Sequence, residues 1–187
     1  APIQRAIMNM DSETGISIMK ITPKLDAGPV MLQEKIKISK EMSFEDLSNK
    51  LSEIGAKLIL ESIKLIENNK VNFIEQKESE ASYAKKIIKN ESRIDWNESA
   101  KKIIAKINAF HPNPGCWFKL FESRIKVIKA IEVKKTGEAG TILDDKMTIA
   151  CAKNAVQILE LKKEGKKQML IDEYLKGNKI KIGQKID

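Results

Sequence analysis

One acidic residue stands out among the side chains that could do chemistry. Asp26 lies in the sequence LDAG, residues 25–28, between two stretches in which apolar and polar residues alternate. This alternation predicts two antiparallel strands, residues 16–21 and 30–38, and a loop held by rigid strands is a common place for a catalytic carboxylate. The competing interpretation is a turn residue without a chemical role, because aspartate also stabilises turns.

Other familiar catalytic patterns are missing from the sequence. It has no glycine-rich phosphate loop, and its only histidine, His111, falls between a predicted helix end and a proline. Cys116 and Cys151 with this one histidine cannot supply the four side-chain ligands of a structural zinc site. Two cysteines also make no disulfide framework, so we expect both to be buried and reduced, and we expect no metal.

Apolar spacing predicts the elements that must position Asp26. Residues 2–10 predict the end of a helix and residues 11–15 a turn. A long helix is expected from Ser43 to Glu67, because its apolar residues recur at three- and four-residue steps. Ser43 and Asp46 fit a capping box at its start. The polar segment 75–82 has no periodicity, and we interpret it as a linker between domains.

The second half, residues 83–187, predicts a small β-barrel with helices. Asn97 is expected to cap a helix that ends before His111. Five strand-like runs follow, at residues 117–121, 125–133, 140–143, 147–152 and 155–161. A short helix at 166–174 and a last strand at 179–182 complete the prediction. Several short strands with one or two helices are typical of an OB-like barrel.

Charge is divided unevenly along the chain. The 187 residues carry a net charge of +8. Residues 1–80 hold 11 basic and 13 acidic residues and residues 81–187 hold 23 and 13, giving net charges of −2 and +10. A basic domain favours a polyanionic partner, although a lysine-rich solvated surface would look the same. The candidate contacts are Lys85, Lys86, Lys89, Arg93, Lys166 and Lys167.

Composition excludes several classes of protein. With 42% hydrophobic and 32% charged residues, the chain is neither disordered nor fibrous. No apolar run approaches the roughly 18 to 20 residues that span a bilayer, and no signal peptide pattern is present. We expect a cytoplasmic protein with no membrane contact.

Several segments resemble, in order, the methionyl-tRNA formyltransferase family. In the first half these are APIQRAI, DSETGISIM and LDAGPVML, and in the second SYAKKI, RIDW, INAFHPNPGCW, GTIL and GKKQM. The resemblance implies that residues 1–74 are the C-terminal part of a doubly wound α/β formyltransferase domain. It also implies that residues 83–187 are an OB-like tRNA-binding domain. The family's catalytic asparagine and histidine precede the APIQR segment, so we expect a fragment that lacks most of the N-terminal catalytic domain and is inactive alone.

The resemblance also implies an activity and a set of site residues. The family transfers a formyl group from 10-formyltetrahydrofolate to the amino group of initiator methionyl-tRNA for translation initiation. Asp26 matches its catalytic aspartate, which orients and polarises the histidine. Leu25, Asp26 and Gly15 are implied contacts of the folate donor. The expected partners are this donor and the tRNA, with a monomeric enzyme that needs no metal.

Two alternatives remain open. A related formyltransferase that acts on a sugar nucleotide has the same aspartate loop. In the other, residues 82–187 are a stand-alone RNA-binding module, which leaves the LDAG loop unexplained. The basic second half and its GTIL and GKKQM segments favour tRNA as the acceptor.

Overall fold

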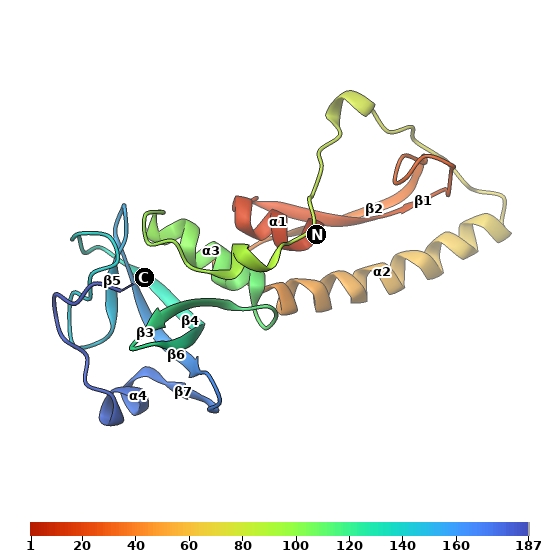
Figure 1. Cartoon of the computed structure of the whole chain (residues 1–187). Coiled ribbons are helices and arrows are strands. Elements are labelled where there is room, and N and C mark those ends of the chain that lie inside the picture. Colours follow the sequence, from red (N-terminus) through yellow and green to blue (C-terminus); the bar gives the residue numbers. More distant parts are fainter. Residues whose placement is uncertain (187) are drawn as a thin grey trace.

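The N-terminal half is a two-stranded antiparallel ribbon, preceded by one helix in the chain and followed by another. The computed structural model describes residues 1–186. Helix α1 (Pro2–Asn9) leads into β1 (Glu13–Met19), which pairs antiparallel with β2 (Val30–Lys37), and α2 (Phe44–Glu67) follows. Figure 1 shows α2 running along the ribbon and away from the C-terminal half. Both predicted strands and the long helix are therefore confirmed, with shifted ends.

The start of α2 follows the predicted chemistry. The Ser43 hydroxyl accepts a hydrogen bond from the Asp46 amide at 3.2 Å, and the Asp46 carboxylate accepts one from the Ser43 amide at 3.0 Å. This reciprocal pair satisfies two amides that a helix N-terminus otherwise leaves without partners. Leu47, Leu51 and Leu58 lie on the buried face of the helix.

The N-terminal half contains the predicted antiparallel strand pair, and its origin in a doubly wound domain stays a prediction. Among residues 1–186 no two strands pair in parallel, and the sheet of the N-terminal half is the antiparallel β1–β2 ribbon alone. The turn expected at residues 11–15 is also shorter than predicted, because β1 already begins at Glu13.

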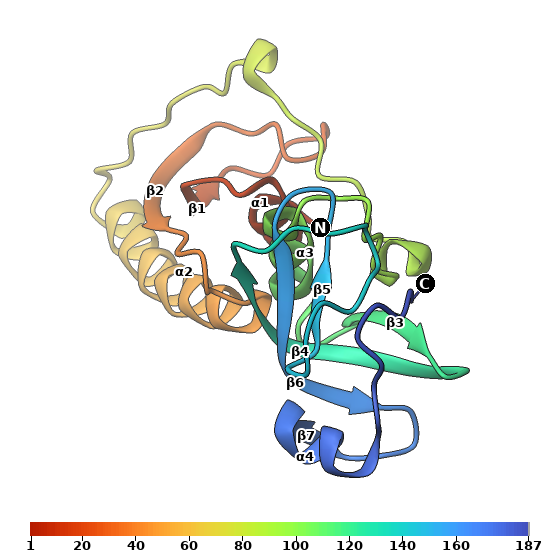
Figure 2. The same cartoon turned by 90° about the vertical axis from the view of Figure 1, so that its left-hand side faces the viewer.

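A long irregular segment joins the two halves, and we call residues 68–99 the connecting segment. It contains two short 3₁₀ turns, η1 (Glu78–Glu80) and η2 (Lys89–Ser92). Ile74 and Val30 exchange two backbone hydrogen bonds of 2.8 Å, so the segment is tied to the first residue of β2. Figures 1 and 2 show it arching away from the ribbon and returning to α1. The linker predicted at 75–82 lies within it, while the domain bounds of 1–74 and 83–187 stay a prediction.

The C-terminal half is an antiparallel half-barrel covered by α3 (Ala100–Phe110). Its strands are β3 (Cys116–Leu120), β4 (Ser123–Val133), β5 (Thr148–Ala150), β6 (Ala155–Lys163) and β7 (Gln168–Leu170), followed by α4 (Ile171–Gly177). The order is β3-β4-β6-β5, with β7 also paired to β6. Within residues 1–186 the edge strands β3 and β5 do not pair with each other, so the sheet is a half-barrel where the sequence predicts an OB-like barrel.

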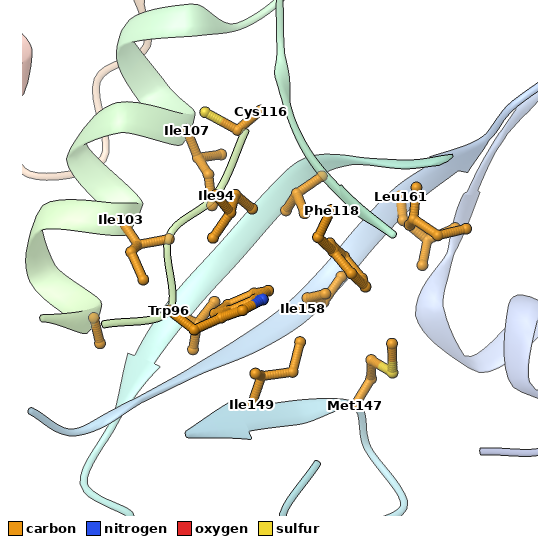
Figure 3. Packing of buried hydrophobic residues seen from close by; sticks show 14 of the residues in the cluster. Ile94, Trp96, Ile103, Ile107, Cys116, Phe118, Met147, Ile149, Ile158 and Leu161 are labelled. Carbon is orange, nitrogen blue, oxygen red and sulfur yellow. The ribbon is translucent and has the colours of Figure 1, made fainter. Parts of the chain in front are cut away.

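The main core lies between α3 and this sheet. In Figure 3, Ile103 and Ile107 from α3 point toward Phe118 of β3 and Ile158 of β6. All four side chains are at most 1% exposed. Trp96 closes the core, with its ring edge-on to Phe118 at a centroid distance of 5.5 Å.

The N-terminal helix joins the same core. Ile7 of α1 and Leu47 and Leu51 of α2 belong to one buried cluster with the residues under α3. Continuous burial of this kind holds neighbouring elements together far more strongly than surface contacts do.

Helix α3 is capped by a different residue from the one predicted. The Ser99 hydroxyl accepts a hydrogen bond from the backbone amide of Lys102 at 3.4 Å. The backbone amide of Asn97 instead donates to the Asp95 carboxylate at 3.0 Å. Asn97 thus stabilises the turn before the helix. Asparagine and aspartate favour such turns as well as helix N-caps.

Three further expectations for the C-terminal half are wrong. The predicted helix at 166–174 is a turn, then β7, then α4, because residues 168–170 pair with β6. The predicted strands at 140–143 and 179–182 do not form, and the first of these makes only isolated bridges to Ile149 and Lys185.

None of the helices in the described part of the chain is both long and apolar enough to cross a bilayer.

Candidate functional site

The Asp26 loop is a closed turn at the end of the β1–β2 ribbon. The Lys20 amide donates to the Pro29 carbonyl at 2.9 Å, which ties the two ends of the loop together. A Cβ at Gly28 would lie only 1.7 Å from the Lys20 carbonyl oxygen. Glycine is therefore required at this position, because any side chain would push the two ends of the loop apart.

Asp26 lies at the tip of this loop with its side chain exposed to solvent. Its φ of 53° is in the left-handed region, which aspartate and asparagine occupy more readily than most residues do. Among residues 1–186 its carboxylate accepts no hydrogen bond, so the group is available to a partner outside the described residues. This arrangement is compatible with the predicted role, which stays a prediction.

A neighbour of the loop was missed by the sequence analysis. The side-chain nitrogen Nε2 of Gln76 donates to the carbonyl oxygens of Asp26 at 3.0 Å and Gly28 at 2.7 Å. Gln76 lies in the predicted linker, where no periodicity marks it. The sequence holds no signal that would have placed it here, because the contact spans 50 positions.

The residues expected to contact folate are only partly brought together. Leu25 lies beside Asp26 and is 87% exposed, while Ile21 on the same loop is 91% exposed. Gly15 instead lies inside β1, paired with Lys35, about 16 Å before the loop at roughly 3.3 Å per residue. A Cβ there would lie 2.4 Å from the Glu34 carbonyl oxygen, so the close approach of the two strands explains this glycine.

The predicted basic residues fall in two groups. Lys85, Lys86 and Lys89 are exposed on the connecting segment beside α1, and Lys166 and Lys167 are exposed in the turn between β6 and β7. No acidic side chain among residues 1–186 forms an ion pair with any of these five lysines.

Arg93 belongs to neither group and lies beside Trp117, part of a surface that the sequence analysis missed. Its guanidinium carbon lies 5.9 Å from the ring centroid of Trp117, and that of Arg124 lies 4.1 Å from the same ring. The Arg124 carbonyl in turn accepts the Glu164 amide at 3.0 Å, near the β6–β7 turn. Two guanidinium groups therefore lie within cation–π range of one indole ring, and this attraction stabilises their arrangement.

The outer face of β3, β4 and β6 extends this basic surface. Lys126 pairs with Trp117 and with Lys162, and Lys119 pairs with Arg124, so these side chains share one face. The outer basic face, as we call it, consists of Trp117, Lys119, Arg124, Lys126 and Lys162. Partial burial, and then the charges of Lys162 and Arg124, lower the pKa of Lys126 below its usual value. Alternation along residues 116–120 could have revealed this face, because Trp117 and Lys119 fall opposite three buried residues.

Comparisons with known families cover both halves of the chain. Residues 1–63 match the family described as "Formyl transferase", and residues 86–179 match "Formyl transferase, C-terminal domain". The chain belongs to the formyl transferase family. The resemblance inferred from the short segments is thereby confirmed, including its order along the chain.

Curated relatives narrow the family further. The chain is 42% identical over 187 residues to methionyl-tRNA formyltransferase of Pelagibacter ubique, and 37% identical over 189 aligned positions to that of Bradyrhizobium diazoefficiens. These alignments cover 100% and 99% of the chain but 60% and 61% of the relatives. The chain is therefore a homologue of methionyl-tRNA formyltransferase that spans about 60% of the length of these relatives.

Solved structures share the fold at lower identity. A HypX variant from Aquifex aeolicus superposes with a TM-score of 0.71 at 21% identity, covering 96% of the chain and 34% of HypX. HypX in complex with tetrahydrofolic acid gives 0.69 at 19% identity, covering 97% and 36%. The sugar 3N-formyl transferase WlaRD also gives 0.69 at 19% identity, covering 89% and 60%. At these identities the likeness shows the fold alone.

Proposed function

We propose that the chain is part of an enzyme that transfers the formyl group of 10-formyltetrahydrofolate to the amino group of initiator methionyl-tRNA. The observation that carries this proposal is the 42% identity to a methionyl-tRNA formyltransferase along the whole chain, through both the Asp26 loop and the basic half. The activity would serve translation initiation in the cytoplasm, with the enzyme acting as a monomer.

The reaction defines what a carboxylate at Asp26 must do. The neutral amine attacks the formyl carbon, a C–N bond forms, the bond from carbon to N10 of the folate breaks, and the proton lost by the amine ends on N10. An imidazole can carry this proton, and a carboxylate that accepts its other N–H keeps it oriented and stabilises its cationic form. Asp26 has an exposed carboxylate that makes no hydrogen bond or ion pair within residues 1–186, as this role requires. A histidine and an asparagine for the other two roles are implied by the family resemblance alone.

The loop also offers one wall for the folate donor. A pterin ring is flat, with apolar faces and a polar edge. Ile21 and Leu25 are exposed apolar side chains of the same loop that carries Asp26. This combination of apolar surface and a nearby carboxylate fits such a ring, and we assign Leu25 and Asp26 to the donor site. Gly15 lies within β1 and not on this loop, and its contact with the donor stays a prediction from the family resemblance.

The basic half supplies the surface for tRNA. Phosphates bind cations without regard to sequence, and unstacked bases bind aromatic and guanidinium planes. The exposed lysines Lys85, Lys86 and Lys89, the turn with Lys166 and Lys167, and Arg93 fit the first role. Trp117, with the guanidinium groups of Arg93 and Arg124 near its ring, fits the second.

The principal alternative is a sugar nucleotide as the acceptor. WlaRD, a sugar 3N-formyl transferase, shares the fold with a TM-score of 0.69. The sequence identity of the chain to it is 19%, against 42% to the tRNA enzyme of Pelagibacter ubique. We therefore favour tRNA.

One assay separates the acceptors. The complete gene product that contains this chain is supplied with 10-formyltetrahydrofolate and either methionylated initiator tRNA or an amino-sugar nucleotide. The proposal predicts formyl-methionyl-tRNA at a kcat/KM at least 100-fold above that for the sugar, on the order expected when a site's contacts fit only one substrate. Preferential formylation of the sugar would overturn it. The 187 residues alone are expected to be inactive in the same assay, because catalytic groups that act as a unit lose several orders of magnitude when separated.

A further inference from the structure

We propose that Gln76 of the connecting segment is a positioning residue that holds the backbone around Asp26. This inference rests on the proposed function, because it concerns the loop that carries the proposed catalytic carboxylate. It adds a residue from outside the loop, 50 positions away in the chain, to the residues that decide where that carboxylate lies.

The contact is a two-pronged one made by a single nitrogen. Gln76 Nε2 donates to the carbonyl oxygen of Asp26 at 3.0 Å and to that of Gly28 at 2.7 Å. The two carbonyls flank Ala27, so the amide bridges the part of the loop in which the chain turns back toward β2. Both hydrogens of the amide nitrogen have acceptors, and both distances lie in the range of well-formed hydrogen bonds.

The connecting segment is itself fixed on either side of Gln76. Two residues before it, Ile74 exchanges two backbone hydrogen bonds of 2.8 Å with Val30 at the start of β2. Two residues after it, Glu78 forms an ion pair with Lys24 of the same loop. These two contacts hold the segment beside the loop, so Gln76 is presented to the loop from a backbone that is fixed on both sides.

Glutamine is suited to this position in a way that similar side chains are not. Its amide nitrogen provides two N–H donors, and the loop offers two carbonyl acceptors. Within residues 1–186 no other side chain donates to these two carbonyls. A glutamate of the same shape would bring only acceptors, and a leucine would bring no polar group. Either change leaves the Asp26 backbone, at its φ of 53°, with fewer constraints on the carboxylate.

The expected consequence is a loss of rate and not of binding. Misplacing a catalytic group by about 1 Å can cost roughly 100-fold in rate. We expect Gln76→Leu and Gln76→Glu, in the complete gene product, to lower kcat of formyl transfer by about 10- to 100-fold. The KM for methionyl-tRNA should stay within about twofold, because the loop lies apart from the basic surface.

The matched control is Gln33→Leu. Gln33 is another exposed glutamine of the ribbon, and its Nε2 donates to the Ser17 hydroxyl at 2.8 Å, within β1 and β2 and outside the loop. This variant loses one side-chain hydrogen bond of the same kind and should keep kcat within about twofold of the unsubstituted protein. Melting temperatures of all variants show whether any of them fails to fold.

A second measurement reads the loop directly and does not depend on activity. Amide hydrogen exchange of residues 18–30, followed by mass spectrometry, should become faster in Gln76→Leu and stay unchanged in Gln33→Leu, because the carbonyl clamp on the loop is lost only in the former.

The outcomes separate this inference from the proposed function. If Asp26→Asn lowers kcat strongly while Gln76→Leu leaves it within twofold, the positioning role is wrong and the proposed function stands. Unchanged loop exchange in Gln76→Leu would also overturn the positioning role. If Asp26→Asn itself leaves kcat unchanged, the catalytic assignment fails and the positioning role fails with it.

Discussion

The guanidinium of Arg5 in α1 forms a two-pronged ion pair with the carboxylate of Glu91 in η2, across 86 positions of the chain. The Nη1–Oε2 distance is 2.6 Å and the Nη2–Oε1 distance is 3.0 Å. Arg5 also donates to the carbonyl oxygens of Lys85 at 3.0 Å and Lys86 at 3.1 Å. One side chain of the N-terminal helix therefore anchors the segment that carries three of the proposed tRNA-binding lysines.

This anchor should stabilise the fold in a pH-dependent way. The hydrogen bond from Arg5 is the main cause that lowers the pKa of Glu91 below its ordinary value of 4.5. A lowered folded-state pKa adds stability above pH 4.5 that is lost as the pH falls through the folded-state value. We expect Glu91→Gln to lower the free energy of unfolding by about 1 kcal/mol at pH 7, with the difference shrinking toward pH 3.

Urea unfolding of the chain at pH 7 and at acid pH measures this effect. The control is Glu13→Gln, which removes a surface ion pair with Lys35 whose side chains are 50% and 64% exposed. That pair should contribute almost nothing. A Glu91→Gln effect that equals the control, or that does not change with pH, would show that the anchor does not stabilise the fold.

The exposed lysines of the connecting segment should contribute to tRNA binding through phosphates. Replacing Lys85, Lys86 and Lys89 together by glutamate should weaken binding of all tRNAs and flatten the dependence of log affinity on log salt. Filter binding or fluorescence anisotropy at several salt concentrations measures both. The matched control replaces Lys50, Lys57 and Lys64, three exposed lysines of α2, by glutamate. Equal losses in the two triple variants would mean that net charge alone, and not this surface, determines binding.

The two cysteines should be chemically inert in the folded chain. Burial raises the pKa of the Cys116 thiol to about 12 and that of Cys151 to about 11. Since the thiolate is the reactive form, neither should be alkylated by iodoacetamide at pH 8, whereas both should react in urea. Mass spectrometry of the two samples tests this, and rapid labelling of Cys116 in the native chain would contradict its burial.

The loop should not tolerate a side chain at Gly28. Gly28→Ala would force a Cβ to 1.7 Å from the Lys20 carbonyl oxygen, so the loop ends must separate. We expect a destabilisation of about 1–3 kcal/mol by the cost of overpacking, with faster amide exchange at residues 20–30. Gly177→Ala is the control, because nothing lies within 4 Å of a Cβ there. If both variants unfold at the same urea concentration, Gly28 and the Lys20 carbonyl do not approach each other as closely as described.

The sequence predicts those elements that are stabilised by residues close to one another along the chain. The alternation around residues 16–21 and 30–38 and the capping box of Ser43 and Asp46 each depend on residues a few positions apart, and the structure confirms them. The clearest errors are elements that depend on distant partners. Strand β7 has three residues and exists because β6 lies beside it, so its sequence alone resembles the start of a helix.

The candidate site shows the same division. Asp26 could be singled out because its loop contains proline and glycine and lies between two stretches in which apolar and polar residues alternate. Gln76 could not, because it lies in a polar segment without periodicity and meets the loop only after β2 has led the chain away and α2 has brought it back (Figure 1). For Trp117 the sequence predicts a place in a strand and nothing more, and only the pairing of β3 with β4 brings Arg124 to its ring.

The measurement that tests the account most directly is formyl transfer by Asp26→Asn in the complete gene product. Asparagine keeps the size of the side chain and tolerates the left-handed backbone at φ 53°, but it removes the negative charge. The account predicts a fall in kcat of roughly 10²–10⁴-fold, with both substrates still bound and a melting temperature close to that of the unsubstituted protein. A kcat within a few-fold of the unsubstituted value would contradict it and leave Asp26 as a turn residue.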